Sequence, residues 1–325
     1  MNPYPSSSPT PAWLQRKLLV VMGKGGVGKT VTCAAIARRA ARAGKRVLLA
    51  EVRAPRRLPS LFGLRAEQDG PLQLAPGIQW INFTPQAALE TYAMRLLKLR
   101  AVYRAVFEQR AVRRFLRALP SLSELLMLGH LVHLIEEGPA DLVVLDAPST
   151  GPGALMLEVP QVIMRTVPEG PLRDGAEWIQ RLLGDPARTT IHLVVLPEEL
   201  PVSEAISLHH RLRDDLGLAR GFVVANRCLP NPFPPGQHPA VDDEGSPMTE
   251  ANAALIQAAR SLRGRLNLQQ VYLDRLQAGV DQAIIQLPEW NPGWNPGWNQ
   301  GTFGTEAIEA LADALQSAER GASWA

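Results

Sequence analysis

The chain has 325 residues, of which 46% are hydrophobic and 20% charged, and its formal net charge is +3. This composition is typical of a folded globular protein with ample core, and the length allows one large α/β domain or two smaller ones. The small net charge gives little support to a nucleic-acid-binding class. Two cysteines, Cys33 and Cys228, exclude a disulfide framework and a cysteine metal quartet, and both thiols are expected to be buried.

Residues 1–15 are predicted to form a disordered tail, followed by one domain over residues 16–325. The beginning of the chain is rich in Pro and Ser, and it lacks the basic, apolar and cleavage-site pattern of a signal peptide. No apolar run approaches the roughly 18 residues that a membrane-spanning helix needs. We therefore expect no integral membrane segment and a cytoplasmic location.

The sequence G-K-G-G-V-G-K-T at residues 23–30 is the strongest functional motif in the chain. It lies between an apolar run at residues 18–22 and a helix-forming run at residues 30–43, as expected where a buried strand is followed by a helix. Its glycines let the backbone wrap around an oxyanion with N–H groups pointing inward, and the helix dipole adds positive charge there. The pattern predicts a phosphate-binding loop for a nucleoside triphosphate.

Individual residues of this loop have predicted roles in binding ATP and Mg²⁺, the expected cofactors. Lys29 should reach the β- and γ-phosphate oxygens, and the Thr30 hydroxyl suits a Mg²⁺ ligand. An apolar run ends at Asp146, the Walker B arrangement that organises Mg²⁺ through water. The predicted nucleotide-binding residues of the loop are Gly25, Gly26, Val27, Gly28, Lys29, Thr30 and Val31.

Short β-type runs alternate with helical runs, which predicts an α/β fold with a doubly wound, mostly parallel sheet. The predicted strands are residues 17–22, 46–51, 78–83, 141–146, 190–196, 221–226 and 282–287. Gly44 is placed to end the helix that follows the phosphate loop, and an acidic helix is predicted over residues 305–320. The expected architecture is that of a P-loop NTPase with an inserted helical subdomain.

The inserted subdomain is predicted at about residues 85–137, where apolar residues recur at helical spacing without any strand signal. The other face of this stretch is strongly basic between Arg95 and Arg117. That face is either a docking surface for an acidic partner or nucleic acid, or an ordinary solvated helix face.

Two loops are predicted to interrupt the alternating pattern. Residues 229–247 are Pro-rich and are expected to form a surface excursion. Residues 290–301 contain a Trp-Asn-Pro-Gly repeat, which favours tight turns. Its tryptophans either clasp a ligand or apolar partner, or belong to a repeat insertion folded back on the surface.

The second residue of the phosphate loop, Lys24, makes the loop resemble the deviant Walker A motif of the MinD, ParA, nitrogenase iron-protein and ArsA group. In that group the extra lysine reaches across a dimer interface to the partner's nucleotide. The resemblance implies that Lys24 stabilises phosphate charge in trans, as an arginine finger does.

Within that group, the chain resembles the ArsA-type ATPases of arsenite pumps and guided-entry targeting over about residues 16–320. Residues 146–151, D-A-P-S-T-G, resemble the family's switch II, and residues 196–204 resemble its Pro-Glu segment. The strand at residues 221–227 resembles the one whose asparagine reads adenine, which assigns that role to Asn226. The family closes over the base just after its last strand, here from Pro288 onward.

The sequence departs from this family at both switches. Arg53 stands where the family's switch I has an Asp that orients the attacking water, and an arginine cannot act as a base. Glu51, two residues earlier, is a candidate substitute. Pro152 replaces the switch II histidine and is expected to stiffen a mobile loop. These changes predict slow hydrolysis, or a nucleotide-gated scaffold that pairs with a more active paralogue.

The resemblance implies a homodimer, or a heterodimer with a paralogue, that acts on a protein client the sequence does not identify. Two cysteines cannot provide an arsenite-binding triad, and the targeting family's zinc-binding cysteine pair is absent from the sequence. The hypothesis that the chain is a DNA-partitioning ATPase similar to ParA rests on the basic helical face alone. Nucleic acid is therefore the less favoured partner.

Overall fold

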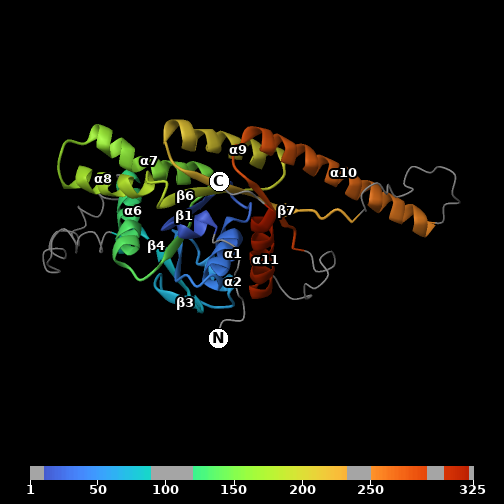
Figure 1. Ribbon diagram of the computed structural model, residues 1–325, viewed down its shortest axis with the longest axis horizontal. Coiled ribbons are helices and arrows are strands. Elements are labelled where there is room, and N and C mark those ends of the chain that lie inside the picture. Colours follow the sequence, from blue (N-terminus) through green and yellow to red (C-terminus); the bar gives the residue numbers. More distant parts are fainter. Residues whose placement is uncertain (1–10, 89–119, 233–249, 291–303, 322–325) are drawn as a thin grey trace.

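A single sheet of eight strands runs through the centre of the described part of the molecule (Figure 1). The computed structural model describes residues 11–88, 120–232, 250–290 and 304–321. The strand order is β3-β4-β2-β5-β1-β6-β7-β8, and every neighbouring pair is parallel except β3 and β4. The prediction of a doubly wound, mostly parallel sheet is confirmed. The strands are β1 (Leu18–Met22), β2 (Val47–Val52), β3 (Leu72–Ala75), β4 (Ile78–Phe83), β5 (Leu142–Asp146), β6 (Thr189–Val195), β7 (Arg220–Cys228) and β8 (Ile284–Pro288).

Helices cover both faces of the sheet, as the buried strands require. In Figure 1, α1, α2 and α11 lie on one side of the strands, and α6 to α10 lie on the other. The 3₁₀ turn η1 precedes β1, and the π-helical turn η2 follows α9. The helices are η1 (Ala12–Gln15), α1 (Lys29–Arg42), α2 (Arg57–Leu61), α6 (Pro120–Glu137), α7 (Thr150–Thr166), α8 (Pro171–Leu183), α9 (Glu199–His210), η2 (Arg211–Asp215), α10 (Glu250–Gly279) and α11 (Thr305–Gly321).

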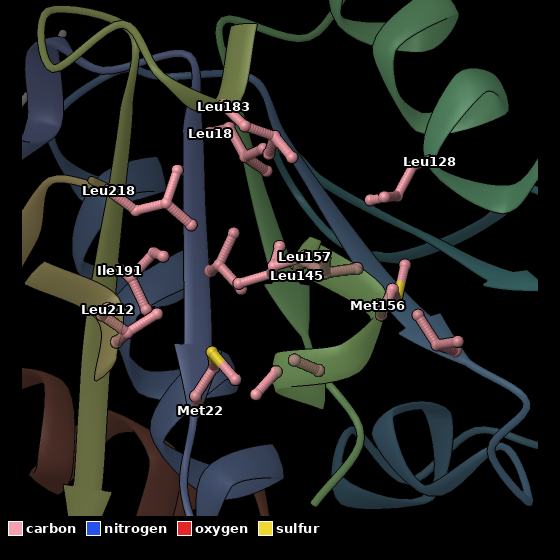
Figure 2. Close-up of a cluster of buried hydrophobic side chains, with 14 of the residues drawn as sticks. Leu18, Met22, Leu128, Leu145, Met156, Leu157, Leu183, Ile191, Leu212 and Leu218 are labelled. Atoms are coloured by element: carbon pink, nitrogen blue, oxygen red, sulfur yellow. The ribbon is translucent and has the colours of Figure 1, made fainter. Parts of the chain in front are cut away.

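Alternate residues of β1 supply the two halves of the hydrophobic core, because successive strand side chains point to opposite faces. Leu18 and Met22 belong to the core under α6 to α9, whereas Leu19 belongs to the core under α1 and α11. Figure 2 shows the first of these cores, where Leu145 of β5 and Leu157 of α7 meet the side chains of β1. Because both faces of β1 are buried, the position of its carboxyl end within the sheet is fixed.

Helix α10 extends away from the body of the molecule (Figure 1). It is 30 residues long and packs against α9, and Leu273 and Leu276 near its C-terminal end are buried. Leu255, nearer its N-terminus, is 69% exposed. Among the described helices, none is long and apolar enough to cross a membrane.

Several sequence predictions lie partly or wholly outside the described residues. These are the tail, most of the helical insert with its basic face, most of the Pro-rich loop and nearly all of the Trp repeat. Of the insert, α6 is described and is helical as predicted. Both cysteines are buried and free of disulfides, as expected, and burial raises the pKa of Cys228 to about 12.

Candidate nucleotide-binding site

The phosphate loop lies at the carboxyl end of β1, between the ends of β5 and β6. The chain leaves β1 toward β2 through α1, whereas it leaves the neighbouring β5 in the opposite direction toward β6 through α7 and α8. Parallel α/β sheets bind ligands in the crevice where the connections diverge in this way. Gly23 begins the loop with its backbone against β6, because a Cβ at this residue would meet the Val194 carbonyl oxygen at 2.2 Å. Glycine is therefore required for the loop to leave the sheet at this point.

Asn226 holds the other end of the loop. Its Nδ2 donates a hydrogen bond of 2.8 Å to the backbone oxygen of Val27, and its side chain is buried at the end of β7. Gly28 has a φ of 97°, and a Cβ there would lie 2.1 Å from Asn226 Nδ2. The amide of Asn226 thus shapes the phosphate loop from below, a contact that the sequence pattern did not reveal. Its predicted reading of adenine stays a prediction.

Lys29 folds back over its own loop at the start of α1. Its ammonium donates hydrogen bonds of 3.0 Å each to the backbone oxygens of Gly23 and Lys24. Burial lowers the pKa of Lys29, and the nearby Asp146 carboxyl partly restores it. The ammonium is therefore positioned over the concave side of the loop, where an anion would neutralise it.

Thr30 and Asp146 form the second half of the site. The Thr30 hydroxyl donates a hydrogen bond of 2.6 Å to Asp146 Oδ2. Asp146 Oδ1 is buried, and no described group bonds to it. Burial raises the pKa of Asp146, against the lowering effects of the Thr30 hydroxyl and the Lys29 charge. A hydroxyl beside a buried carboxylate with one unused oxygen fits the all-oxygen ligand set of Mg²⁺.

Lys24 leaves the phosphate loop toward α9, where its ammonium lies 2.7 Å from Glu204 Oε1. Both side chains are partly exposed, at 35% and 40%. A cavity of about 440 Å³ lies beside this pair, between the N-terminus of α7 and α9, and is lined by Thr150, Gly151 and Glu204 among others. Glu204 is thus a site residue that sequence reasoning did not single out.

Comparison with known proteins identifies the family. A family model described as "Anion-transporting ATPase" (ArsA_ATPase) matches residues 16–169, which hold the phosphate loop and Asp146. "ATPase BagA" of Mycobacterium tuberculosis is 30% identical to the chain over 225 residues, which are 66% of this chain and 66% of that protein. This chain belongs to the ArsA ATPase family.

Other relatives match over a smaller share of their length. The "Arsenical pump-driving ATPase" of Escherichia coli is 31% identical to this ArsA-family chain over 210 residues, which are 64% of the chain and 34% of the pump protein. A second relative of that name, from Acidiphilium multivorum, is 30% identical over 210 residues. The chain thus aligns with about a third of each pump protein and about two thirds of BagA.

Glu51 occupies a different environment from the one expected of a water-positioning group in an ArsA-family site. Its side chain is fully buried, and its Oε1 accepts hydrogen bonds from the backbone N–H groups of Arg57 and Leu58, at 3.1 Å and 3.3 Å. Its Oε2 accepts a bond of 2.7 Å from the indole N–H of Trp80. Burial raises the pKa of Glu51, and these three donors oppose that rise. Glu51 therefore anchors the first turn of α2.

Glu51 nevertheless lies beside the metal-binding candidate. It pairs in register with Asp146 on the neighbouring strand, so both side chains project from the same face of the sheet. Its assignment as a substitute for the missing switch I aspartate stays a prediction.

The two departures from the family switches have clear structural positions. Arg53 has a φ of 49°, and its guanidinium bonds to Glu124 Oε1 of α6 at 2.8 Å. Pro152 was expected in a loop, but it lies in the first turn of α7, which begins at Thr150. Proline is tolerated there because the first N–H groups of a helix need no intrahelical acceptor. Pro152 therefore stiffens the start of a helix.

The remaining predicted site residues line the same end of the sheet. Gly25 and Gly26 leave open space where a Cβ would point, and Val27 is buried beneath the loop. Val31 is half-buried on α1, and Pro288 ends β8, which is separated from β1 by β6 and β7. The described residues hold no cluster of three His, Cys, Asp or Glu side chains arranged to bind a metal.

Proposed function

We propose that the protein is a Mg²⁺-dependent ATP-binding switch that hydrolyses ATP slowly and acts as a dimer on a protein client. The observation that carries this proposal is the meeting of Lys29, Thr30 and Asp146 around one loop at the carboxyl end of β1. Membership of the ArsA ATPase family supports ATP as the nucleotide.

Each part of the site has a proposed role in holding the triphosphate. The backbone N–H groups of Gly25, Gly26 and Gly28 bind phosphate oxygens, and Lys29 exchanges its two carbonyl acceptors for the β- and γ-phosphates. Thr30 and Asp146 hold Mg²⁺, which supplies charge neutralisation at the phosphates when bound. The loop keeps its shape throughout, because Asn226 is bonded to Val27.

Lys24 has its proposed role across a dimer interface. Its side chain is partly exposed at the rim of the site, and its ammonium is paired with Glu204 of the same chain. Release from Glu204 frees Lys24 to reach the nucleotide of a second subunit, where its charge stabilises the leaving phosphate. The second subunit is either another copy or a paralogue. The cytoplasm is the proposed location.

A second candidate function is a scaffold that binds ATP and barely hydrolyses it. Arg53 favours it, because the residue expected to orient water is replaced by a cation tied to Glu124. If this candidate is right, the parent protein binds ATP without turnover, and Arg53→Asp gains hydrolysis.

Isothermal titration calorimetry with ATP tests the primary proposal. The parent should bind ATP more tightly with Mg²⁺ than with EDTA, and Asp146→Asn should lose that difference while it still binds ATP. Lys29→Ala should weaken ATP binding roughly tenfold or more, because a charge-assisted contact to phosphate is lost. A parent protein that binds no ATP in either condition would refute the proposal.

A further inference from the structure

Three arginines lie between the end of β2 and the start of α2, the last of them as the first residue of α2, and two of the three bond to other parts of the fold. Arg53 is tied to Glu124 of α6. Arg56 donates from Nε to Asp69 Oδ1 at 3.0 Å and from Nη1 to the backbone oxygens of Ala66 and Glu67, each at 3.1 Å. Both arginines have a positive φ, of 49° and 57°, so the connection is held in a specific shape. The guanidinium groups of Arg53 and Arg56 are therefore both bonded within the protein.

The third arginine, Arg57, is the first residue of α2 and is exposed. Its guanidinium has no hydrogen bond or ion pair with any described residue, although its backbone is fixed. The backbone of Arg57 is fixed and its guanidinium is unpaired, whereas Arg53 and Arg56 are both paired. The Arg57 guanidinium is therefore available to a ligand.

The backbone of Arg57 is fixed beside the proposed Mg²⁺ site. Its N–H donates to Glu51 Oε1 at 3.1 Å, and Glu51 pairs in register with Asp146. Asp146 in turn accepts the hydrogen bond from Thr30 of the phosphate loop. Three consecutive contacts therefore join the start of α2 to the start of α1, and α2 packs beside α1.

The charge of Arg57 affects the pKa values of two groups at the phosphate site. Burial is the main cause that lowers the pKa of Lys29, and the Arg57 charge lowers it further. Burial raises the pKa of Asp146, and Arg57 is among the groups that oppose this rise. Both effects place the Arg57 charge within electrostatic range of Lys29 and Asp146.

We propose that Arg57 contacts the terminal phosphate of the triphosphate bound in its own subunit and makes the site prefer ATP to ADP. The proposal rests on the function proposed above. A guanidinium offers two parallel donors to phosphate oxygens, and the long Arg57 side chain extends from a backbone anchored to Glu51. Glu51 bonds the first turn of α2 and pairs with Asp146, which sets the position from which the Arg57 side chain extends. Arg57 thereby joins Lys29 as a second cation from the same subunit at the bound nucleotide, whereas Lys24 is supplied by the partner subunit.

The test compares the affinities of a non-hydrolysable ATP analogue, AMPPNP, and of ADP, both measured with Mg²⁺ by calorimetry. Arg57→Ala should weaken AMPPNP binding by about 10- to 100-fold, the range for loss of a charge-assisted hydrogen bond. Its ADP affinity should stay within about threefold of the parent, since ADP lacks the terminal phosphate. The AMPPNP affinity of Arg57→Lys should lie between those of the parent and Arg57→Ala, because lysine keeps the charge and loses the paired donors.

Arg65→Ala is the matched control, since it removes an exposed arginine from the same segment and should leave both affinities unchanged. Equal AMPPNP affinities of Arg57→Ala and the parent would show a solvated surface arginine and overturn the inference. Equal weakening of both nucleotides by Arg57→Ala would also overturn it, because the effect would not involve the terminal phosphate. A parent that binds neither nucleotide refutes the proposed function itself, and this inference with it.

Discussion

Glu51 and Asp146 are buried carboxylates side by side at the ends of β2 and β5, but they differ in how many donors surround them. Glu51 accepts three hydrogen bonds, from two backbone N–H groups and the Trp80 indole. Asp146 accepts one from Thr30 and keeps a buried oxygen without a described partner. The first arrangement supports a helix, and the second leaves room for a cation.

Loss of the indole donor should destabilise the protein through Glu51. Trp80→Phe should lower the free energy of unfolding at neutral pH by about 1–3 kcal/mol beyond the cost of its smaller side chain, because one carboxylate oxygen stays buried and unbonded. The Trp80 bond stabilises the ionised form of Glu51. Its contribution is therefore present above the raised pKa of Glu51 and is lost as the pH falls through that pKa.

Urea denaturation at several pH values measures this effect, with Trp13→Phe as the control. Trp13 is as deeply buried, but its indole N–H has no partner among the described residues. Trp13→Phe removes the same ring atoms but no hydrogen bond. The loss of unfolding free energy in this variant should therefore not depend on whether Glu51 is ionised. Equal costs for the two variants at every pH would contradict the assigned role of Trp80.

Residues that belong to recognisable motifs, including the distant Asp146, could be assigned to the site from sequence alone, whereas specific side-chain pairs formed by the fold could not. The phosphate loop motif predicts Lys29 and Thr30 because their roles follow from spacing along one turn. Trp80 and Glu51 lie on different strands, and Lys24 and Glu204 are 180 positions apart. No local pattern records such pairs.

At the level of elements, the phosphate loop is fitted to β7 as well as to β1. Gly28 provides the left-handed backbone at the start of α1, and the missing side chain leaves space for Asn226. Asn226 in turn satisfies the Val27 carbonyl. Contacts within the chain therefore support the shape of the loop.

Gly28→Ala should disturb this fit. We expect a loss of unfolding free energy of about 1–2 kcal/mol from the left-handed backbone and a further 1–3 kcal/mol, roughly, from displaced Asn226. Gly25→Ala is the control, because its φ is not positive and its Cβ would point into open space. Urea denaturation of the nucleotide-free variants measures both. A Gly28→Ala variant as stable as Gly25→Ala would contradict the described packing.

The strands of the sheet centre were predictable because they are continuous apolar runs, buried on both faces. Each predicted strand is present, with ends that differ by no more than two residues from the observed bounds. The antiparallel edge strand β3 was not predicted, since it has four residues of which only Leu74 is buried. Helix α10 was not predicted either, because much of it is exposed and so lacks a strong apolar face.

At the level of the whole molecule, the pair formed by Lys24 and Glu204 bears on the proposed dimer. Within one chain Glu204 neutralises Lys24 at the rim of the site. A dimer in which Lys24 contacts the partner's nucleotide requires this pair to separate. Because both groups are partly exposed, the pair opposes separation only weakly.

Glu204→Gln should therefore favour the dimer modestly. In sedimentation velocity with Mg²⁺ and AMPPNP, its dissociation constant should be about two- to fivefold lower than that of the parent, which corresponds to an exposed ion pair. Lys24→Ala should weaken the dimer. Glu158→Gln is the control, since it breaks the nearby pair with Arg211 and leaves Lys24 untouched. A weaker dimer in Glu204→Gln would show that Glu204 serves the interface itself.

Steady-state ATP hydrolysis by the purified protein, compared with Lys29→Ala, tests the central claim most directly. Thermal unfolding of both proteins, measured alongside, shows whether the variant keeps its fold after losing the bonds to Gly23 and Lys24. The account predicts slow turnover in the parent that requires Mg²⁺ and disappears in a folded Lys29→Ala. Turnover that persists in Lys29→Ala would place the chemistry elsewhere, and would contradict the account.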